Sequence, residues 1–277
     1  MTRACVIGWP IEHSRSPIIH GYWLRALGID GSYTREPVRP EDLATFLASL
    51  GERGFAGCNV TVPHKEAALA LAAERDAAVV AIGAANTLWL QDRRLCASNT
   101  DAYGYMTYLG LKAPEWSTRD APVLILGAGG AARAIVHGFL EAGVARVCVC
   151  NRSRGRSEEL VRHFGARVEA WDWDARNDAA RAAGVIVNTT TLGMKGAGDP
   201  GIDFAGVHLD TVVSDIVYVP LETAFLAAAR ARGLCTVDGL GMLLHQAVPG
   251  FERWFGVRPE VTDTLYNLVR ADIERPA

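Results

Sequence analysis

The sequence predicts an α/β protein of two domains, an N-terminal domain with a mostly parallel sheet and a second, doubly wound domain. Three features favour this fold class. Short apolar runs alternate with helical segments up to residue 102, a glycine-rich turn at residues 127–134 joins an apolar run to a helix, and the chain after residue 239 shows only helical patterns. Alternating strands and helices are typical of parallel sheets covered by helices. The 277 residues suffice for two domains of about 150 residues each.

The elements of the first domain follow from apolar periodicity and from helix-start signals. In order, they are a strand at residues 4–7, a helix opened by Ser16 as N-cap and Pro17, a strand at 31–38, a helix at 40–50 and a strand at 55–61. Two runs at 86–90 and 94–97, around Gln91-Asp92-Arg93, predict a hairpin at the sheet edge.

The second domain is predicted to contain strands at residues 122–126, 145–150, 185–188 and 212–217. Two helices, at 240–255 and 259–273, follow Asp238-Gly239. Because short terminal helices need a surface to cover, we expect them to return to the first domain. The predicted domains are therefore 1–102 with 239–277, and 103–238.

The glycine-rich turn GAGGAARA follows the short apolar run at 122–126, which is typical of a strand buried in a parallel sheet. Gly127 would permit the tight turn, Gly129 would let the main chain approach a pyrophosphate, and Ala132 would allow close packing of the helix. The phosphates would then lie at the helix N-terminus. The turn predicts a Rossmann-type dinucleotide domain that binds its cofactor through Gly127, Ala128, Gly129, Gly130 and Ala131.

The end of the next strand indicates which dinucleotide binds. Asn151 comes 21 residues after Gly130, where an NAD site would place an acidic ribose ligand, and neither Asp nor Glu stands there. Asn151 and Ser153 can donate hydrogen bonds to a 2′-phosphate, and Arg152 and Arg156 can add charge-assisted ones. The segment predicts NADP as the cofactor, with a solvated basic loop as the alternative.

Three polar clusters follow the N-terminal strands, at the sheet edge where open α/β sheets bind ligands. In the first, Ser14 and Ser16 lie two residues apart before a helix, an arrangement that suits a small carboxylate. A helix cap alone would also explain Ser16. The cluster predicts an anion site.

The second and third clusters contain the residues that are expected to bind the substrate and to act on it. Asn59, Thr61 and Lys65 lie around a proline turn, and Lys65 opens a helix, where the helix dipole disfavours a cation. The third cluster contains Asn86-Thr87 and Asn99-Thr100-Asp101, in which Asp101 is either a functional carboxylate or the N-cap of a helix that begins at Ala102. These groups suit a small polyhydroxylated acid.

Lys65 and Asp101 are the predicted catalytic residues. An ammonium within hydrogen-bond reach of a ketone oxygen can stabilise the charge that hydride transfer creates there and can supply the proton. Asp101 would orient Lys65 and accept a hydrogen bond from a substrate hydroxyl. The sequence leaves open which of the two carries the transferred proton.

Composition excludes several classes of protein. The net charge of −3, with both signs interspersed, argues against nucleic-acid binding and against a membrane-surface patch. No run approaches the roughly 18 apolar residues of a membrane helix, and the N-terminus does not resemble a signal peptide. Six cysteines without CxxC spacing suit a reducing cytoplasm. Seven scattered histidines predict no metal site. The protein is expected to be a monomer or a homodimer.

The chain resembles the shikimate dehydrogenase family, which includes shikimate/quinate dehydrogenases, over nearly its whole length. The matching motifs are GWPIEHSRSP (8–17), NVTVPHK (59–65), GAANT (83–87), NTDAYG (99–104), GAGGAARA (127–134), NRSRGR (151–156), NTTTLGM (188–194), DIVYVPLET (215–223) and DGLGMLLHQA (238–247). The resemblance implies NADPH-dependent, reversible reduction of 3-dehydroshikimate to shikimate, in the pathway to chorismate and the aromatic amino acids.

The resemblance also implies roles for individual residues. Ser14, Ser16 and Tyr218 would hold the substrate carboxylate, while Thr61, Lys65, Asn86, Asp101 and Gln246 would surround the ring hydroxyls. Ile216 and Gly239 would line the nicotinamide. His13 is expected to be structural.

The sequence departs from the family pattern at three positions, and two other functions stay open. Gly21 and Val219 stand where many members have Asn, and Ser153 replaces the commoner Thr. A quinate or quinate/shikimate dehydrogenase would often use NAD and an acidic residue after the second strand, which is absent here. A noncatalytic dinucleotide-sensing regulator would not need Lys65 and Asp101.

Overall fold

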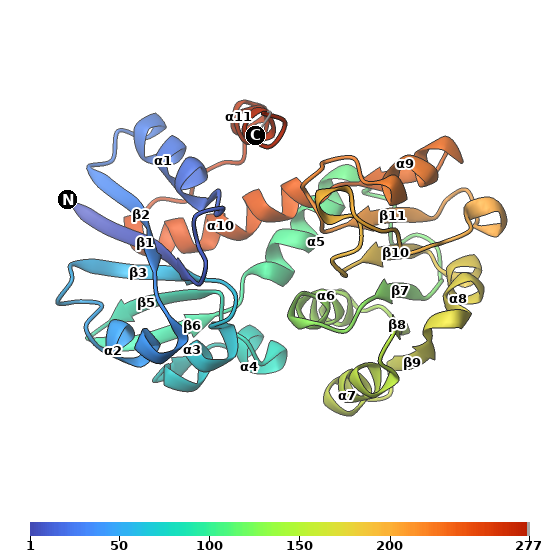
Figure 1. Ribbon diagram of the computed structural model, residues 1–277, viewed down its shortest axis with the longest axis horizontal. Coiled ribbons are helices and arrows are strands. Elements are labelled where there is room, and N and C mark those ends of the chain that lie inside the picture. Colours follow the sequence, from blue (N-terminus) through green and yellow to red (C-terminus); the bar gives the residue numbers. More distant parts are fainter. Residues whose placement is uncertain (276–277) are drawn as a thin grey trace. The chain divides into compact units, whose positions relative to one another are not determined.

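The computed structural model describes residues 1–275 and contains two compact units (Figure 1). The first unit comprises Met1–Asp101 and Leu244–Val269. The second comprises Ala102–Leu243, together with the described residues from Arg270 onward. Each unit is built on a six-stranded sheet with helices packed against it, so the predicted α/β class is confirmed.

The sheet of the first unit has the strand order β2-β1-β3-β5-β6-β4. The elements are β1 (Thr2–Gly8), α1 (Ser16–Ala26), β2 (Gly31–Pro37), a 3-10 turn (Pro40–Asp42), α2 (Leu43–Ala48), β3 (Phe55–Val60), α3 (Lys65–Leu71), β4 (Glu74–Arg75), α4 (Ala77–Ile82), β5 (Thr87–Gln91) and β6 (Arg94–Ser98). β1 pairs in parallel with β2 and β3, whereas β5 is antiparallel to β3 and to β6. The predicted strands and the edge hairpin are confirmed, and β4, which pairs in parallel with β6, was not predicted.

The two faces of this sheet are covered by different helices. On one face, α2, α3 and α4 contribute Leu47, Ala68 and Val79 to a core that also contains Ile7 and Val60 of the strands. Helix α1 packs on β2. Apolar side chains of the strands and of these helices thus form one core on the α2 side of the sheet.

The sheet of the second unit is entirely parallel, in the order β12-β11-β10-β7-β8-β9. The elements are α5 (Asp101–Lys112), β7 (Val123–Leu126), α6 (Gly130–Glu141), β8 (Val147–Asn151), α7 (Arg154–Phe164), β9 (Val168–Asp172), a 3-10 turn (Trp173–Ala175), α8 (Arg176–Ala182), β10 (Val185–Asn188), 3-10 turns at Met194–Gly196 and Phe204–Gly206, β11 (Val212–Asp215), α9 (Ala224–Ala231) and β12 (Cys235–Val237). Figure 1 shows α6 and α7 on one side of this sheet and α8 and α9 on the other. This strand order and the two helical layers define the doubly wound dinucleotide fold.

The last two helices are α10 (Gly239–Phe255) and α11 (Asp263–Ile273), and the part of them within Leu244–Val269 belongs to the first unit. Trp254 of α10 donates from Nε1 to the main-chain oxygen of Leu88 at 2.9 Å. Gly57 of β3 permits this contact, since a Cβ there would collide with the indole of Trp254 and with the Leu88 oxygen. The small residue in β3 therefore lets α10 pack closely on the sheet.

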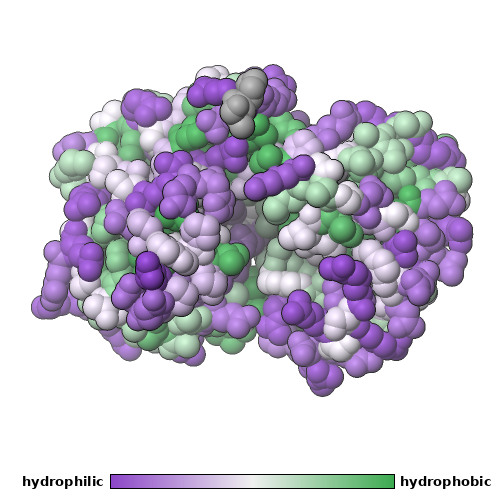
Figure 2. All heavy atoms as spheres, in the orientation of Figure 1, coloured by the Kyte–Doolittle hydropathy of each residue, from purple (hydrophilic) through white to green (hydrophobic). Residues whose placement is uncertain are grey.

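Hydrophilic residues cover most of the face shown in Figure 2, and apolar residues lie between them in small groups. None of the helices formed by residues 1–275 combines the length and the apolar character that crossing a membrane requires.

Candidate active site

Lys65 and Asp101 form an ion pair in the first unit. Lys65 is the first residue of α3 and Asp101 the first residue of α5, and Lys65 Nζ lies 2.6 Å from Asp101 Oδ2. The Lys65 side chain is 28% exposed and that of Asp101 is 11% exposed, so the pair is accessible at one end only. The predicted proximity of these two residues is confirmed.

The other oxygen of Asp101 is also occupied. Asn86 Nδ2 donates to Asp101 Oδ1 at 2.8 Å. Because both carboxylate oxygens accept from side chains, the carboxylate of Asp101 is oriented toward Lys65 and Asn86. The alternative that Asp101 serves only as an N-cap is not supported by these contacts.

Asn86 is held in a buried polar network. Its Oδ1 accepts from the main-chain nitrogen of Thr100 at 2.9 Å and from the Thr87 hydroxyl at 2.9 Å. Gln246 of α10 joins this network, since its main-chain oxygen accepts from the Thr100 hydroxyl at 2.8 Å and its side-chain oxygen lies 3.5 Å from Asn86 Nδ2. The structure thus brings together four of the predicted substrate residues, Lys65, Asn86, Asp101 and Gln246.

Thr61 and the turn that follows it set the start of α3. The Thr61 nitrogen donates to the Ile7 oxygen at 3.0 Å, and its oxygen accepts from the His64 nitrogen at 3.0 Å. The buried His64 ring contacts the Val38 oxygen through Nε2 at 2.7 Å. This turn fixes the backbone immediately before Lys65.

Ser14 and Ser16 lie side by side, but Ser16 does not cap a helix. The Ser14 hydroxyl donates to Ser16 Oγ at 3.3 Å and accepts from the Ser16 nitrogen at 3.4 Å. Helix α1 begins at Ser16 itself, with Arg15 in the N-cap position and no side-chain cap. The N-cap prediction for Ser16 is therefore wrong, because its side-chain oxygen accepts from the Ser14 hydroxyl and not from the first helical N–H groups. A capping role does not account for Ser16.

The predicted dinucleotide turn borders a hollow of about 220 Å³ in the second unit. Gly127 has a φ of +108°, and a Cβ at this position would lie 2.7 Å from Thr189 Oγ1. Gly129 and Gly130, at the start of α6, have open space where a Cβ would be, and Ala131 follows in the first helical turn. The glycines therefore leave room for a group bound at the N-terminus of α6.

The arginines after β8 are not equivalent. Arg152 and Arg156 line the hollow together with Asn151 and Ala128. Arg154 instead forms ion pairs with carboxylates, including Asp172 at 2.6 Å. Arg152 and Arg156 are thus the cations that line the hollow, and their role in binding a 2′-phosphate stays a prediction.

The remaining predicted residues of this segment are Asn151 and Ser153. Asn151 Nδ2 donates to the Ser153 oxygen at 2.8 Å, which shapes the turn into α7. Ser153 is the N-cap residue of α7 and makes no side-chain cap. Its hydroxyl is consequently not used by the helix.

Sequence reasoning missed other residues that line the same hollow. These are Trp173, Thr189, Thr190, Thr191 and Leu192. The motif at residues 188–194 contained a signal for the last four, because it follows a strand end in the same sheet. Trp173 lies in a 3-10 turn after β9, a strand that was not predicted.

Ile216 and Tyr218 lie in a loop that is held by a buried carboxylate. Asp215, at the end of β11, accepts hydrogen bonds from the Val217 nitrogen at 2.9 Å, from Asn188 Nδ2 at 3.0 Å and from the Thr223 hydroxyl at 2.7 Å. Burial raises the pKa of Asp215 to about 6, and these hydrogen bonds oppose the shift. The carboxylate thus fixes the loop that carries Ile216 and Tyr218.

Gly239 lies next to this loop, where a Cβ would collide with the main-chain oxygen of Ile216. Tyr218 is half-buried and belongs to the second unit, whereas Ser14 and Ser16 belong to the first. The shared carboxylate role of these three residues stays a prediction.

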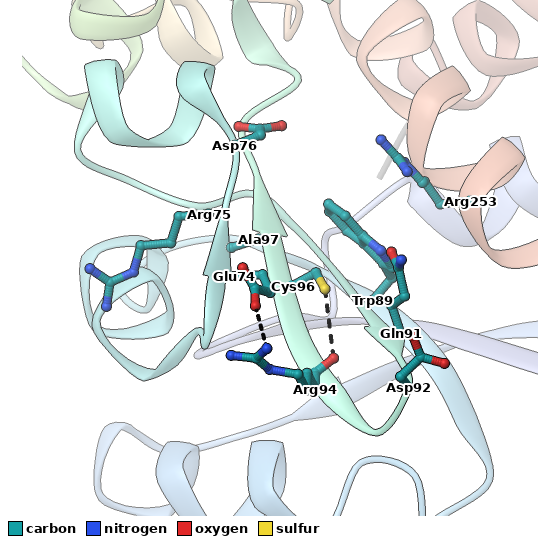
Figure 3. A pocket seen from close by; sticks show the side chains of 10 residues that line it. All are labelled: Glu74, Arg75, Asp76, Trp89, Gln91, Asp92, Arg94, Cys96, Ala97 and Arg253. Atoms are coloured by element: carbon teal, nitrogen blue, oxygen red, sulfur yellow. Dashed lines mark hydrogen bonds and ion pairs between the residues drawn. The ribbon is translucent and has the colours of Figure 1, made fainter.

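No group of three or more His, Cys, Asp and Glu residues within 1–275 is arranged to hold a metal ion. A hollow of about 430 Å³ at the β4–β5–β6 edge of the first unit contains none of the predicted site residues (Figure 3). Three of its charged residues interact within the hollow: Arg94 pairs with Glu74 at 2.8 Å, and Arg253 of α10 lies 4.5 Å from the centre of the Trp89 ring.

One unit is all-parallel and doubly wound, with a glycine turn and two arginines, and the other contains a lysine–aspartate pair. Together these features define a dinucleotide-dependent oxidoreductase of small polar molecules. Three family models match the chain in order: the shikimate dehydrogenase substrate-binding domain at residues 6–88, shikimate/quinate 5-dehydrogenase at 111–193, and the shikimate 5′-dehydrogenase C-terminal domain at 239–265.

Known relatives agree with these matches. The NADP-dependent shikimate dehydrogenase of Brucella canis is 58% identical over 276 residues, which cover 99% of this chain and 95% of that protein. The chain belongs to the shikimate dehydrogenase family.

Solved structures share the fold. Shikimate 5-dehydrogenase of Thermus thermophilus, in complex with NADP(H) and shikimate, superposes with a TM-score of 0.86 at 36% identity, covering 98% of this chain and 99% of that one. Quinate dehydrogenase of Corynebacterium glutamicum, in complex with NAD, gives a TM-score of 0.90 at 29% identity and covers 97% and 98%.

Proposed function

We propose that the protein catalyses the NADPH-dependent, reversible reduction of 3-dehydroshikimate to shikimate. The observation that carries this proposal is the 2.6 Å pair of Lys65 and Asp101, set among neutral hydrogen-bonding groups in a chain of this family. We assign substrate binding to residues 1–102 and 239–277 and NADP binding to residues 103–238.

Substrate binding is assigned by the chemistry of each group. The hydroxyls of Ser14 and Ser16, with that of Tyr218, bind the substrate carboxylate. Thr61, Asn86 and Gln246 bind the ring hydroxyls, for which amide and hydroxyl groups can both donate and accept. These side chains are buried or half-buried, which strengthens such hydrogen bonds relative to those made in water.

In the reduction, Lys65 acts as the general acid. When NADPH is bound, its nicotinamide supplies the hydride to the carbonyl carbon. The Lys65 ammonium donates a hydrogen bond to the carbonyl oxygen, stabilises the negative charge that grows on it and transfers a proton to it. Asp101 holds the ammonium in place, and Asn86 holds Asp101. In the reverse direction, the Lys65–Asp101 pair receives the proton of the substrate hydroxyl.

NADP binding is assigned to the hollow beside α6. Gly127, Ala128, Gly129, Gly130 and Ala131 provide the pyrophosphate site. Arg152 and Arg156, with Asn151 and Ser153, bind the 2′-phosphate, and Ile216 and Gly239 line the nicotinamide. No carboxylate stands at the end of β8 to favour an unphosphorylated ribose, because that position is Asn151.

A turnover assay tests the function directly. The purified protein should oxidise NADPH when 3-dehydroshikimate is added, and should reduce NADP with shikimate. NADH should serve much less well, and quinate should be a poor substrate in the reverse direction. Equal use of NADH would refute the assignment of Arg152 and Arg156, and preference for quinate would favour the other activity of the family.

We also propose a cytoplasmic location and a monomeric or homodimeric state. The location is supported by the free cysteines, of which all but Cys235 are buried. Light scattering of the purified protein would determine its mass in solution, and neither state requires a change in the site described above.

A further inference from the structure

Two residues of β2, Tyr33 and Arg35, contact the serine pair from the strand beside it. They are two positions apart, so both side chains project from the same face of the strand. Arg35 donates to the main-chain oxygen of Ser14 from Nε at 2.9 Å and from Nη2 at 2.5 Å. Two N–H groups of one rigid guanidinium thus converge on one carbonyl of the segment that carries Ser14 and Ser16.

Tyr33 lies beside the other serine, in the interior of the unit. The Ser16 side chain opposes the rise that burial causes in the pKa of Tyr33. The Tyr33 hydroxyl donates to Asn59 Oδ1 at 2.6 Å. Asn59 is buried and donates in turn to the Asn86 oxygen at 3.2 Å and to the Thr87 hydroxyl at 3.3 Å. A continuous set of hydrogen bonds therefore runs from Tyr33, beside Ser16, through Asn59 to Asn86, the residue that holds Asp101.

The ring of Tyr33 is itself fixed. It is buried, and the ring of His20 in α1 stacks on it with centroids 4.0 Å apart and an angle of 10° between the planes. Burial lowers the pKa of His20 to about 3, so His20 is neutral near neutral pH. Tyr33 therefore has little freedom to move away from Ser16, which suits a group that positions another side chain.

We propose that Tyr33 and Arg35 are positioning residues for the substrate carboxylate. Arg35 fixes the main chain at Ser14, and Tyr33 fixes the hydroxyl of Ser16, so that both hydroxyls are held in the orientation that binds the anion. The exposed guanidinium of Arg35 also places a positive charge beside this anion site. The inference rests on the proposed function of Ser14 and Ser16.

Variants of β2 test the proposal, with KM and kcat measured separately for shikimate and for NADP. Arg35→Met, which keeps the length of the side chain but removes the charge and the paired donors, should raise KM for shikimate about tenfold. Tyr33→Phe should raise it several-fold. For both variants, kcat and KM for NADP should stay within about twofold of wild type, because the proton-transfer pair and the dinucleotide unit are unchanged. The KM of Arg35→Lys for shikimate should lie between those of Arg35→Met and wild type, because lysine restores the charge but not the paired donors of the guanidinium.

Matched controls come from the same unit. Arg3 on β1 likewise donates to a main-chain oxygen, that of Arg53, at 3.0 Å, and Tyr22 on α1 shares a hydrogen bond of 3.3 Å with Thr262. Arg3→Met and Tyr22→Phe should therefore leave KM for shikimate unchanged. Calorimetric titration with shikimate, at a temperature where the melting curve shows the variant folded, gives the same comparison without turnover.

The outcomes separate this proposal from the proposed function. A wild-type protein that does not turn over shikimate would refute the function. An active wild-type protein whose affinity for shikimate is unchanged in Arg35→Met and in Tyr33→Phe would refute the positioning role alone. The positioning role would also be refuted if the Tyr33 and Arg35 variants lost kcat at constant KM. It would be refuted as well if the Arg3 and Tyr22 controls raised KM for shikimate as much as those variants do.

Discussion

Replacement of Lys65 by Met removes the proposed general acid and keeps the length and apolar stem of the side chain. A positioned acid contributes about 10²- to 10⁴-fold to the rate, equivalent to roughly 3–5 kcal/mol of barrier. We therefore expect kcat to fall by at least about 100-fold. KM for shikimate should rise by no more than about tenfold, because Lys65 supplies one charged hydrogen bond among several polar contacts.

The fold should tolerate this change. Asp101 retains the Asn86 donor at 2.8 Å, and the pair is partly exposed on the Lys65 side. The loss of stability should lie between that of an exposed pair and that of a buried one, about 1–3 kcal/mol. A melting curve would verify that the variant is folded at the temperature of the assay.

Stopped-flow and steady-state measurements of NADPH absorbance give kcat and KM for Lys65→Met. The variant Lys112→Met provides a matched control. Lys112, at the end of α5, is exposed, and its ammonium lies 5.6 Å from the centre of the Tyr108 ring. The control should keep wild-type kcat. A Lys65→Met protein with kcat within about threefold of wild type would refute the role of Lys65 as the acid.

Three further predictions follow from the two units. Arg156→Ala should lower kcat/KM for NADPH about 10- to 100-fold while activity with NADH changes little, whereas Arg154→Ala, which removes an ion-paired arginine, should not alter the preference. Ser14→Ala should raise KM for shikimate at nearly constant kcat, and a purely catalytic defect would contradict its binding role. Asp215 has its pKa raised to about 6 from 3.8, so its contribution to stability is present below pH 3.8 and is lost as the pH rises through 6. Between pH 3.8 and pH 6, the free energy of unfolding of the wild type, measured with denaturant, should fall by up to about 3 kcal/mol relative to that of Asp215→Asn. If the free energies of unfolding of the two proteins depend on pH in the same way, this assignment is excluded.

Patterns of apolar residues predicted most of the fold because the sheets are buried on both faces. The runs at 122–126 and 185–188 are almost wholly branched and apolar, and they became β7 and β10 within one residue of their predicted limits. β4 gave no such signal, since it consists of the charged residues Glu74 and Arg75 and pairs only at the sheet edge. Strands of this length are defined by their partner and not by their own sequence.

The candidate site was predicted as a set of residues, but the contacts between them were not. Ser16 shows the limit, because Ser followed by Pro is a typical helix start, and yet the Ser16 oxygen accepts from Ser14 and caps no helix. Tyr33 and Arg35 had no motif of their own, and only the pairing of β2 beside β1 brings them to the serines. Trp173 was missed for the same reason, since its contribution to the hollow depends on how β9 ends.

The most direct test of the account is a crystal structure of the protein with shikimate bound. The account predicts that Lys65 Nζ lies within about 3 Å of the substrate hydroxyl that becomes the ketone, with the substrate carboxylate at the hydroxyls of Ser14 and Ser16. A bound shikimate with its carboxylate at Lys65, or with no oxygen within hydrogen-bond distance of Nζ, would contradict it.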